Sequence, residues 1–122
     1  MNKEDTDGTK GIDRQIDNIE FAVSDIGRSK AFYGAAFGWS FTEYGPDYCE
    51  FSDGRLTGGL TTGSPKPGGP LIILYADDLA ATQARLEAAG ARIVVETFSF
   101  PGGSRFHFQD PDGYELAVWS DK

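Results

Sequence analysis

The feature that most constrains this chain is an internal repeat, because one pattern of elements occurs twice along its 122 residues. The letters "VSDI" (23–26) and "YADDL" (75–79) each join an apolar strand pattern to a helical one. The letters "EFSDG" (50–54) and "HFQDPDG" (107–113) each form the last hairpin of their half. Two copies of about 50 residues are too few and too long for a solenoid, so we expect them to pair into one domain. The predicted parts are a disordered tail at 1–14 and a domain at 15–122, with repeat one at 15–62, a linker at 63–69 and repeat two at 70–121.

Each half has the pattern of a β-α-β-β-β unit. Residues 16–23 alternate apolar and polar side chains, which predicts a strand with one face on a core. A helix is expected from a cap at Ser24 or Asp25 to Gly38, and another from Asp77 or Asp78 to Gly90. The other predicted strands cover residues 39–44, 48–51, 56–62, 71–76, 91–100, 104–109 and 114–120. The predicted fold class is α+β, with two βαβββ repeats that form a curved mixed sheet around a cleft and helices outside.

Charge and cysteine content limit the cellular location and the binding partners that we expect. The chain has 19 Asp and Glu against 11 Lys and Arg, a net charge of -8 that repels nucleic acid and anionic membranes and attracts cationic ligands. The longest apolar run is far shorter than a membrane span. The single cysteine, Cys49, excludes an intrachain disulfide and suits a cytoplasmic location; it shares a strand face with Phe51, so we expect a core residue and no nucleophile. The polar N-terminus predicts no signal peptide.

Three pieces in a fixed order carry a resemblance to a known family. A strand that ends in an aspartate is followed by "AFYGAAFGW" (31–39) and, late in the chain, by "DPDG" (110–113). Together with the repeat, they resemble the vicinal oxygen chelate superfamily of glyoxalase I, the bleomycin-resistance proteins and the extradiol dioxygenases, over residues 16 to 120. The resemblance implies a homodimer whose partner completes or covers each cleft. For the enzymes it implies a divalent metal that binds two neighbouring substrate oxygens as a Lewis acid.

The resemblance also implies where such a metal would be held, on the first and last strand of each repeat. Counting from the motifs puts these positions at Asn18, Gly58, Leu71 and Ala117. Glycine, leucine and alanine offer no donor side chain, and one amide oxygen does not hold a divalent cation. The sequence therefore predicts no metal, no cofactor, and a protein that is not a metal-dependent glyoxalase.

One alternative keeps a metal. The stretch "FHFQDPDGYELAVW" (106–119) holds the only histidine, His107, and a carboxylate, Glu115, on either side of a tight turn. With Glu20 they would form a displaced site with the three protein ligands that a catalytic zinc-type site requires. The residue types alone leave this alternative open.

Strand parity predicts which residues face the cleft. The set combines apolar and aromatic walls with a few polar groups, as small-molecule pockets do. The predicted ligand-binding residues are Asn18, Glu20, Tyr48, Glu50, Tyr75, Arg105, His107, Glu115 and Trp119, and Ala22, Leu71, Ile73 and Ala117 share their face. The carboxylates of this set either hold a cation, accept protons or pair with Arg105 and His107.

Three functional hypotheses follow. The first is a metal-independent small-molecule-binding protein that forms a homodimer. The second is an antibiotic-sequestering protein, because the negative charge and Trp39, Tyr48 and Trp119 are compatible with a cationic glycopeptide of the bleomycin type. The third is a glyoxalase-like lyase, isomerase or dioxygenase that uses the displaced metal site or acid–base chemistry by Glu20, Glu50 or His107.

Overall fold

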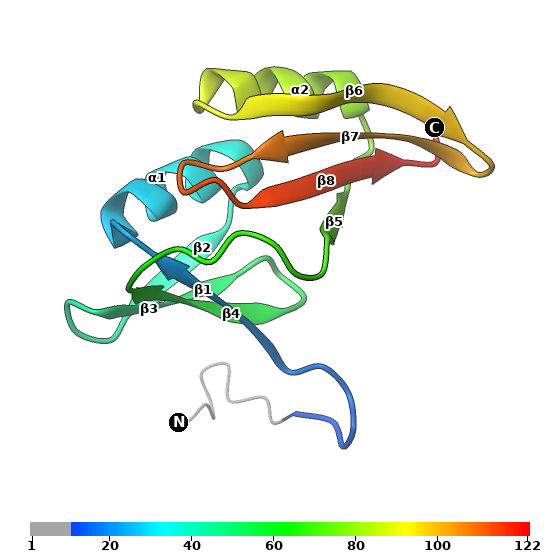
Figure 1. Ribbon diagram of the computed structural model, residues 1–122. Helices are drawn as coiled ribbons and strands as arrows, with labels where there is room; N and C mark the ends of the chain where they lie inside the picture. Colours follow the sequence, from blue (N-terminus) through cyan, green and yellow to red (C-terminus); the bar gives the residue numbers. More distant parts are fainter. Residues whose placement is uncertain (1–10) are drawn as a thin grey trace.

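The computed structural model describes residues 11–122, so most of the predicted tail at 1–14 lies outside the described residues. Residues 11–17 contain no helix or strand, and two βαβββ units follow (Figure 1). The first unit consists of β1 (Asn18–Val23), α1 (Ile26–Phe37), β2 (Ser40–Glu43), β3 (Tyr48–Ser52) and β4 (Thr57–Thr62). The second consists of β5 (Ile72–Tyr75), α2 (Leu79–Ala88), β6 (Arg92–Phe100), β7 (Gly103–Gln109) and β8 (Glu115–Ser120).

The strands form two four-stranded sheets with the same topology. Their orders are β1-β4-β3-β2 and β5-β8-β7-β6. In each sheet the first strand of the repeat runs parallel to the last, and the other neighbours are antiparallel. A parallel pair needs a long crossover connection, which in each repeat includes the helix and the intervening strands. The α+β class and the duplicated βαβββ pattern are confirmed, with two separate sheets in place of one continuous sheet.

Both helices begin at an aspartate cap. The Asp25 side chain accepts the backbone N–H of Arg28 at 3.0 Å, and the Asp78 side chain accepts that of Ala81 at 3.0 Å. Helix α1 ends at Gly38, whose φ of 70° lies in the left-handed region that glycine tolerates. Within residues 11–122 neither helix is long and apolar enough to cross a membrane.

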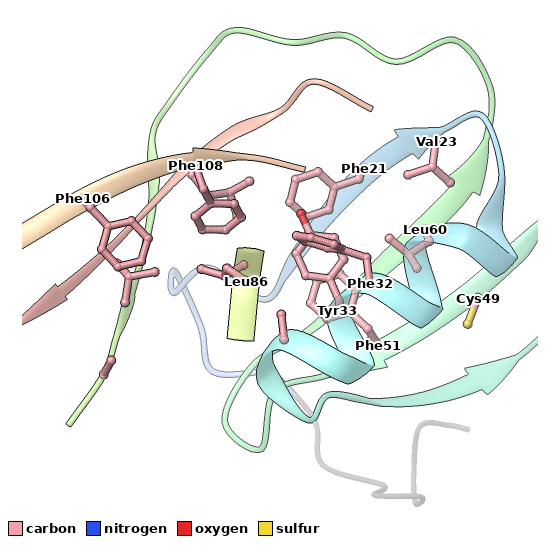
Figure 2. Close-up of a cluster of buried hydrophobic side chains, with 14 residues drawn as sticks. Phe21, Val23, Phe32, Tyr33, Cys49, Phe51, Leu60, Leu86, Phe106 and Phe108 are labelled. Carbon is pink, nitrogen blue, oxygen red and sulfur yellow. The ribbon is translucent and has the colours of Figure 1, made fainter. Parts of the chain in front are cut away.

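One apolar core joins the two repeats. Figure 2 shows aromatic side chains of the first repeat, among them Phe21 and Phe32, in the same cluster as Phe106 and Phe108 of the second. The rings of Phe32 and Phe108 lie 6.3 Å apart between centroids. Trp39 stacks on Tyr33 and Phe51, with centroids 4.5 and 4.4 Å apart. Its ring therefore packs against the core and not into the cleft, contrary to the role that the antibiotic hypothesis assigned to it.

A buried hydrogen bond connects the two sequence motifs that carried the family resemblance. The Tyr33 hydroxyl, on α1, donates to Oδ2 of Asp110 at 2.7 Å, and both residues are buried. The other oxygen of Asp110 accepts the backbone N–H groups of Asp112 and Tyr114 at 2.9 and 3.0 Å. One carboxylate thus orders the "DPDG" turn of the second repeat and attaches it to the helix of the first.

Two further polar contacts cross between the repeats at the same place. Arg28 on α1 forms an ion pair of 2.6 Å with Asp112. The Tyr114 hydroxyl donates to the backbone oxygen of Ala22 at 2.8 Å and accepts the backbone N–H of Lys66 at 2.9 Å. The last hairpin of repeat two is therefore held by α1, by β1 and by the linker.

Among residues 11–122 no equivalent hydrogen bond joins α2 of the second repeat to the β3–β4 hairpin of the first. Eight residues after its cap, α2 carries the buried Leu86 where α1 carries Tyr33. The side chain of Asp53, in the first hairpin, accepts only the turn N–H groups of Arg55 and Leu56. The two halves share a backbone plan, and the contact that α2 makes with the first repeat is of another kind, a hydrogen bond of 3.4 Å from Arg85 to the backbone oxygen of Ala36 on α1.

We predict that Tyr33→Phe lowers the free energy of unfolding by about 1–3 kcal/mol at pH 7, because it leaves a buried carboxylate one donor short. Burial raises the pKa of Asp110, and loss of the tyrosine donor raises that pKa further. A carboxyl whose folded-state pKa is raised stabilises the fold below its unfolded pKa and loses this contribution as pH rises. The deficit of the variant should therefore shrink as pH falls and Asp110 becomes neutral.

Urea unfolding at several pH values measures this deficit. Tyr44→Phe, at a tyrosine that is 61% exposed, is the matched control and should leave stability unchanged. A deficit that stays constant between about pH 7 and about pH 4 would contradict the assignment to Asp110.

Candidate ligand-binding site

A groove with a volume of about 920 Å³ lies where the two sheets approach each other. Strand β1 and the end of β4 form one wall, β5, β7 and β8 form the other, and residues 66–70, between β4 and β5, close one side. The size falls within the usual range for small-molecule sites. Its polar lining residues are Glu20, Thr61, Lys66, His107, Gln109 and Glu115.

His107 and Glu115 form a hydrogen-bonded pair that lines this groove. The two residues lie on neighbouring antiparallel strands, and the register places them diagonally on one sheet face. Nδ1 of His107 lies 2.8 Å from Oε2 of Glu115. The imidazole is largely buried, the carboxylate is about half exposed, and Nε2 of His107 is buried without a hydrogen-bond partner. The pair fixes the orientation of the imidazole ring. A buried ring nitrogen without a hydrogen bond is costly in a native structure, so the unpartnered Nε2 indicates a functional role.

Glu20 lines the same groove, but the three side chains do not assemble as a metal centre. Residues 11–122 contain no group of three or more His, Cys, Asp or Glu placed to hold a metal ion. The displaced site of Glu20, His107 and Glu115 therefore has no support in the geometry.

The four positions implied by the family resemblance also lack donors. Asn18, at the start of β1, and Leu71, directly before β5, are exposed, and Ala117 is fully buried. In the strand register, Gly59 pairs with Glu20 as Ala117 pairs with Ile73, so the counterpart of Ala117 is Gly59 and not Gly58. The count from the turn glycine was wrong by one, because the first hairpin has one more residue between its turn glycine and this position. None of these residues fits a divalent metal.

The face of the first sheet that points away from the apolar core, which we call its open face, is acidic. Glu20 and Glu50 both pair with Gly59, from opposite sides. A Cβ on Gly59 would lie 2.2 Å from the Tyr48 hydroxyl oxygen, so the phenol lies across this glycine. Burial raises the pKa of Tyr48, and the charges of Glu20 and Glu50 raise it further. These groups lie close together, although only Glu20 lines the groove.

The open face of the second sheet is aromatic. Tyr75, Trp119 and Arg105 occupy register neighbours on β5, β8 and β7, and none of them lines the groove. Four of the exposed large apolar side chains lie on this sheet, at Ile73, Tyr75, Val95 and Phe98, and Leu71 directly precedes β5.

Two of these residues were not among the cleft-facing residues predicted from the sequence. Val95 pairs with His107 and Phe98 with Arg105, so both share the open face although their numbers differ in parity. A register shift between Val95 and Phe98 reverses the alternation within β6. The run of nine strand residues showed no sign of it.

Cys49 has the predicted structural role. It is fully buried, and burial raises the pKa of its thiol. A thiol that stays protonated and inaccessible is not a nucleophile.

Comparison with known proteins agrees with the fold. The model of the Glyoxalase/Bleomycin resistance protein/Dioxygenase superfamily matches residues 15–118, and the chain belongs to this superfamily. A search of curated proteins finds no match.

Solved structures with this fold are similar over most of their length. A glyoxalase-related enzyme from Fulvimarina pelagi has 22% identity and a TM-score of 0.77, with 88% of each chain covered. The fosfomycin resistance protein FosX from Listeria monocytogenes, solved with Mn(II), has 18% identity and a TM-score of 0.77, covering 88% of this chain and 90% of that one. TioX from Micromonospora sp. ML1 has 18% identity and a TM-score of 0.69, with coverages of 87% and 95%. At these identities the likeness shows the fold alone.

The two adjacent glycines of β4 should respond differently to substitution. A Cβ on Gly58 would lie 2.3 Å from the backbone oxygen of Ile19 and 2.1 Å from the Phe51 ring, whereas a Cβ on Gly59 meets the movable end of Tyr48. We expect Gly58→Ala to lower the free energy of unfolding by about 3 kcal/mol or more and Gly59→Ala by about 1 kcal/mol. Urea unfolding measures both, and equal losses would show that Tyr48 is not free to move.

Proposed function

We propose that this protein binds a small organic molecule in the groove between its sheets, without a resident divalent metal, and that it does so as a homodimer. The observation that carries the proposal is the composition of the groove. It contains carboxylates and a His107–Glu115 pair, while the positions that would hold the superfamily's metal carry Asn18, Gly59, Leu71 and Ala117.

The groove favours a ligand with an apolar body and hydrogen-bond donors. Its apolar walls include Ile19, Leu71 and Leu116. The exposed carboxylates of Glu20 and Glu115 accept hydrogen bonds from hydroxyl or ammonium groups. The net charge of -8 strengthens the preference for a neutral or cationic molecule over an anion in this groove.

Binding can be tested with a library of small amines and alcohols, screened by ligand-observed NMR against the wild-type protein. We predict that Glu20→Gln and Glu115→Gln each weaken the hits by about tenfold, because each loses a charged acceptor. Glu87→Gln, on the exposed surface of α2, removes the same charge away from the groove and should leave binding unchanged. Equal affinity in all three variants would place the hits elsewhere and overturn the proposed site.

Metal content is measured separately on protein purified without chelators. We expect less than stoichiometric zinc, nickel, iron or manganese by mass spectrometry, and no rise in melting temperature when these ions are added, because a bound ion would stabilise the folded state. A stoichiometric metal that survives dialysis would overturn metal-independent binding.

The homodimer rests on the superfamily resemblance. Light scattering or sedimentation that gives only the monomer mass would contradict it.

The His107–Glu115 pair supports a second candidate function, acid–base catalysis. If Nδ1–H donates to Glu115, the unpartnered Nε2 is a proton acceptor oriented by a carboxylate. Turnover of methylglyoxal hemithioacetal with and without added zinc or nickel tests the glyoxalase version. No turnover under either condition would remove it.

A further inference from the structure

The open face of the second sheet carries a row of four side chains, one from each strand. Phe98 on β6 pairs with Arg105 on β7, Arg105 with Trp119 on β8, and Trp119 with Tyr75 on β5. We call these four residues the aromatic row. It crosses the whole width of the sheet, and none of its members lines the groove of the proposed function.

Arg105 lacks the partner that a partly buried charge normally has. Its guanidinium carbon lies 5.4 Å from the centre of the Phe98 ring, and its Nε is buried without a hydrogen bond. Among residues 11–122 no carboxylate lies within ion-pair distance of it, although acidic residues outnumber basic ones by 19 to 11 in the chain. Arg28, by contrast, is paired with Asp112. A guanidinium left unpaired amid so many carboxylates indicates a missing anion.

The aromatic members of the row are exposed in a manner that is unusual for a surface with no partner. Tyr75 is 46% exposed and Phe98 is 39% exposed. The Tyr75 and Trp119 rings meet edge to face with centroids 5.3 Å apart, and Phe100 lies 6.3 Å from Trp119. Contiguous exposed apolar surface of this kind marks an interaction site.

The aromatic row is a property of the second repeat and not of the fold. The register places Tyr48, Thr61 and Ala22 in the equivalent row of the first sheet. Tyr44, whose backbone N–H donates to the Tyr48 carbonyl, takes the fourth position, so that row has two aromatic rings and no cation. The packing of the repeat therefore does not require the arginine or the indole of Trp119, whose equivalents are Tyr48 and Thr61.

We propose that the aromatic row binds a planar aromatic molecule that carries one carboxylate. The ring packs on Trp119, and the carboxylate accepts hydrogen bonds from the guanidinium of Arg105, which lies over Phe98 and whose planar fork matches two carboxylate oxygens. One cation balances one carboxylate. A doubly charged phosphate would add an unbalanced charge to a chain that is already strongly acidic.

The neighbouring charges also orient the ligand. At the β5 end of the row, the Tyr75 hydroxyl donates to Asp121 and accepts a hydrogen bond from Lys122, which in turn pairs with Asp77. The hydroxyl is already engaged, and the Asp121 carboxylate repels an anion at this end. The ligand carboxylate therefore points toward Arg105, and its ring extends toward Trp119.

The probe for this site is 2-naphthoate, compared with 2-naphthalenemethanol, which lacks the charge, and cyclohexanecarboxylate, which lacks the aromatic ring. Proton–nitrogen NMR follows the Arg105 Nε–H and the Trp119 indole N–H. We expect 2-naphthoate to shift both signals saturably, and both matched compounds to bind about tenfold more weakly or worse.

Arg105→Gln should weaken 2-naphthoate binding by about tenfold or more, because it removes the charged fork and keeps most of the stem. Arg55→Gln, in the exposed turn of the first hairpin, makes the same charge change away from the row and should have no effect. Glu115→Gln alters the groove and should also leave 2-naphthoate binding unchanged. Melting temperatures confirm that the variants are folded.

Several results would overturn the proposal. Equal affinity for 2-naphthoate and the neutral alcohol would remove the role of Arg105, as would equal losses in Arg55→Gln and Arg105→Gln. Tighter binding of 2-naphthyl phosphate would replace the carboxylate by a phosphate. Light scattering that shows a dimer broken by Arg105→Gln, with no response to 2-naphthoate, would assign the row to a second copy of the chain. Loss of binding only in Glu115→Gln would move the ligand to the groove.

Discussion

The hydrogen bond between Tyr33 and Asp110 is the interaction on which the joined structure depends. It is buried, it connects α1 of one repeat to the last hairpin of the other, and the same carboxylate caps the N–H groups of its own turn. A buried carboxylate without these donors would be costly, so this hydrogen bond stabilises the turn and the helix together. The position of the groove follows, because Tyr114 in this turn contacts both β1 and the linker that form its walls.

The two repeats share one backbone topology, but the open faces of their sheets carry different side chains. The first sheet presents Glu20, Glu50 and a phenol lying over a glycine, whereas the second presents aromatic rings and an unpaired arginine. A sheet face allows this difference because side chains that point away from the core are not constrained by packing. The superfamily fold is thus compatible with different side-chain chemistry on the equivalent faces of its two sheets.

The face on which the predicted residues lie was predictable, because strand parity depends only on local geometry. The nine predicted lining residues all lie on strands, and Glu20, His107 and Glu115 line one groove. Parity could not separate the groove from the aromatic row, since that division depends on how the two sheets meet. It also missed Val95 and Phe98, because the register shift in β6 depends on its partner strand. Trp39 was placed in the cleft, but stacking on Tyr33 and Phe51 holds it against the core.

The sequence by itself determined the duplicated βαβββ plan, the helix caps, the turns and the absence of donor side chains at the superfamily's metal positions. Each of these depends on contacts within a few residues or on residue identity alone. Only the tertiary structure decided that His107 pairs with Glu115 while Arg105 stays unpaired, and that Tyr33 meets Asp110 across 77 positions of the chain. Such pairings arise from the packing of the two repeats against one core, which no local pattern specifies.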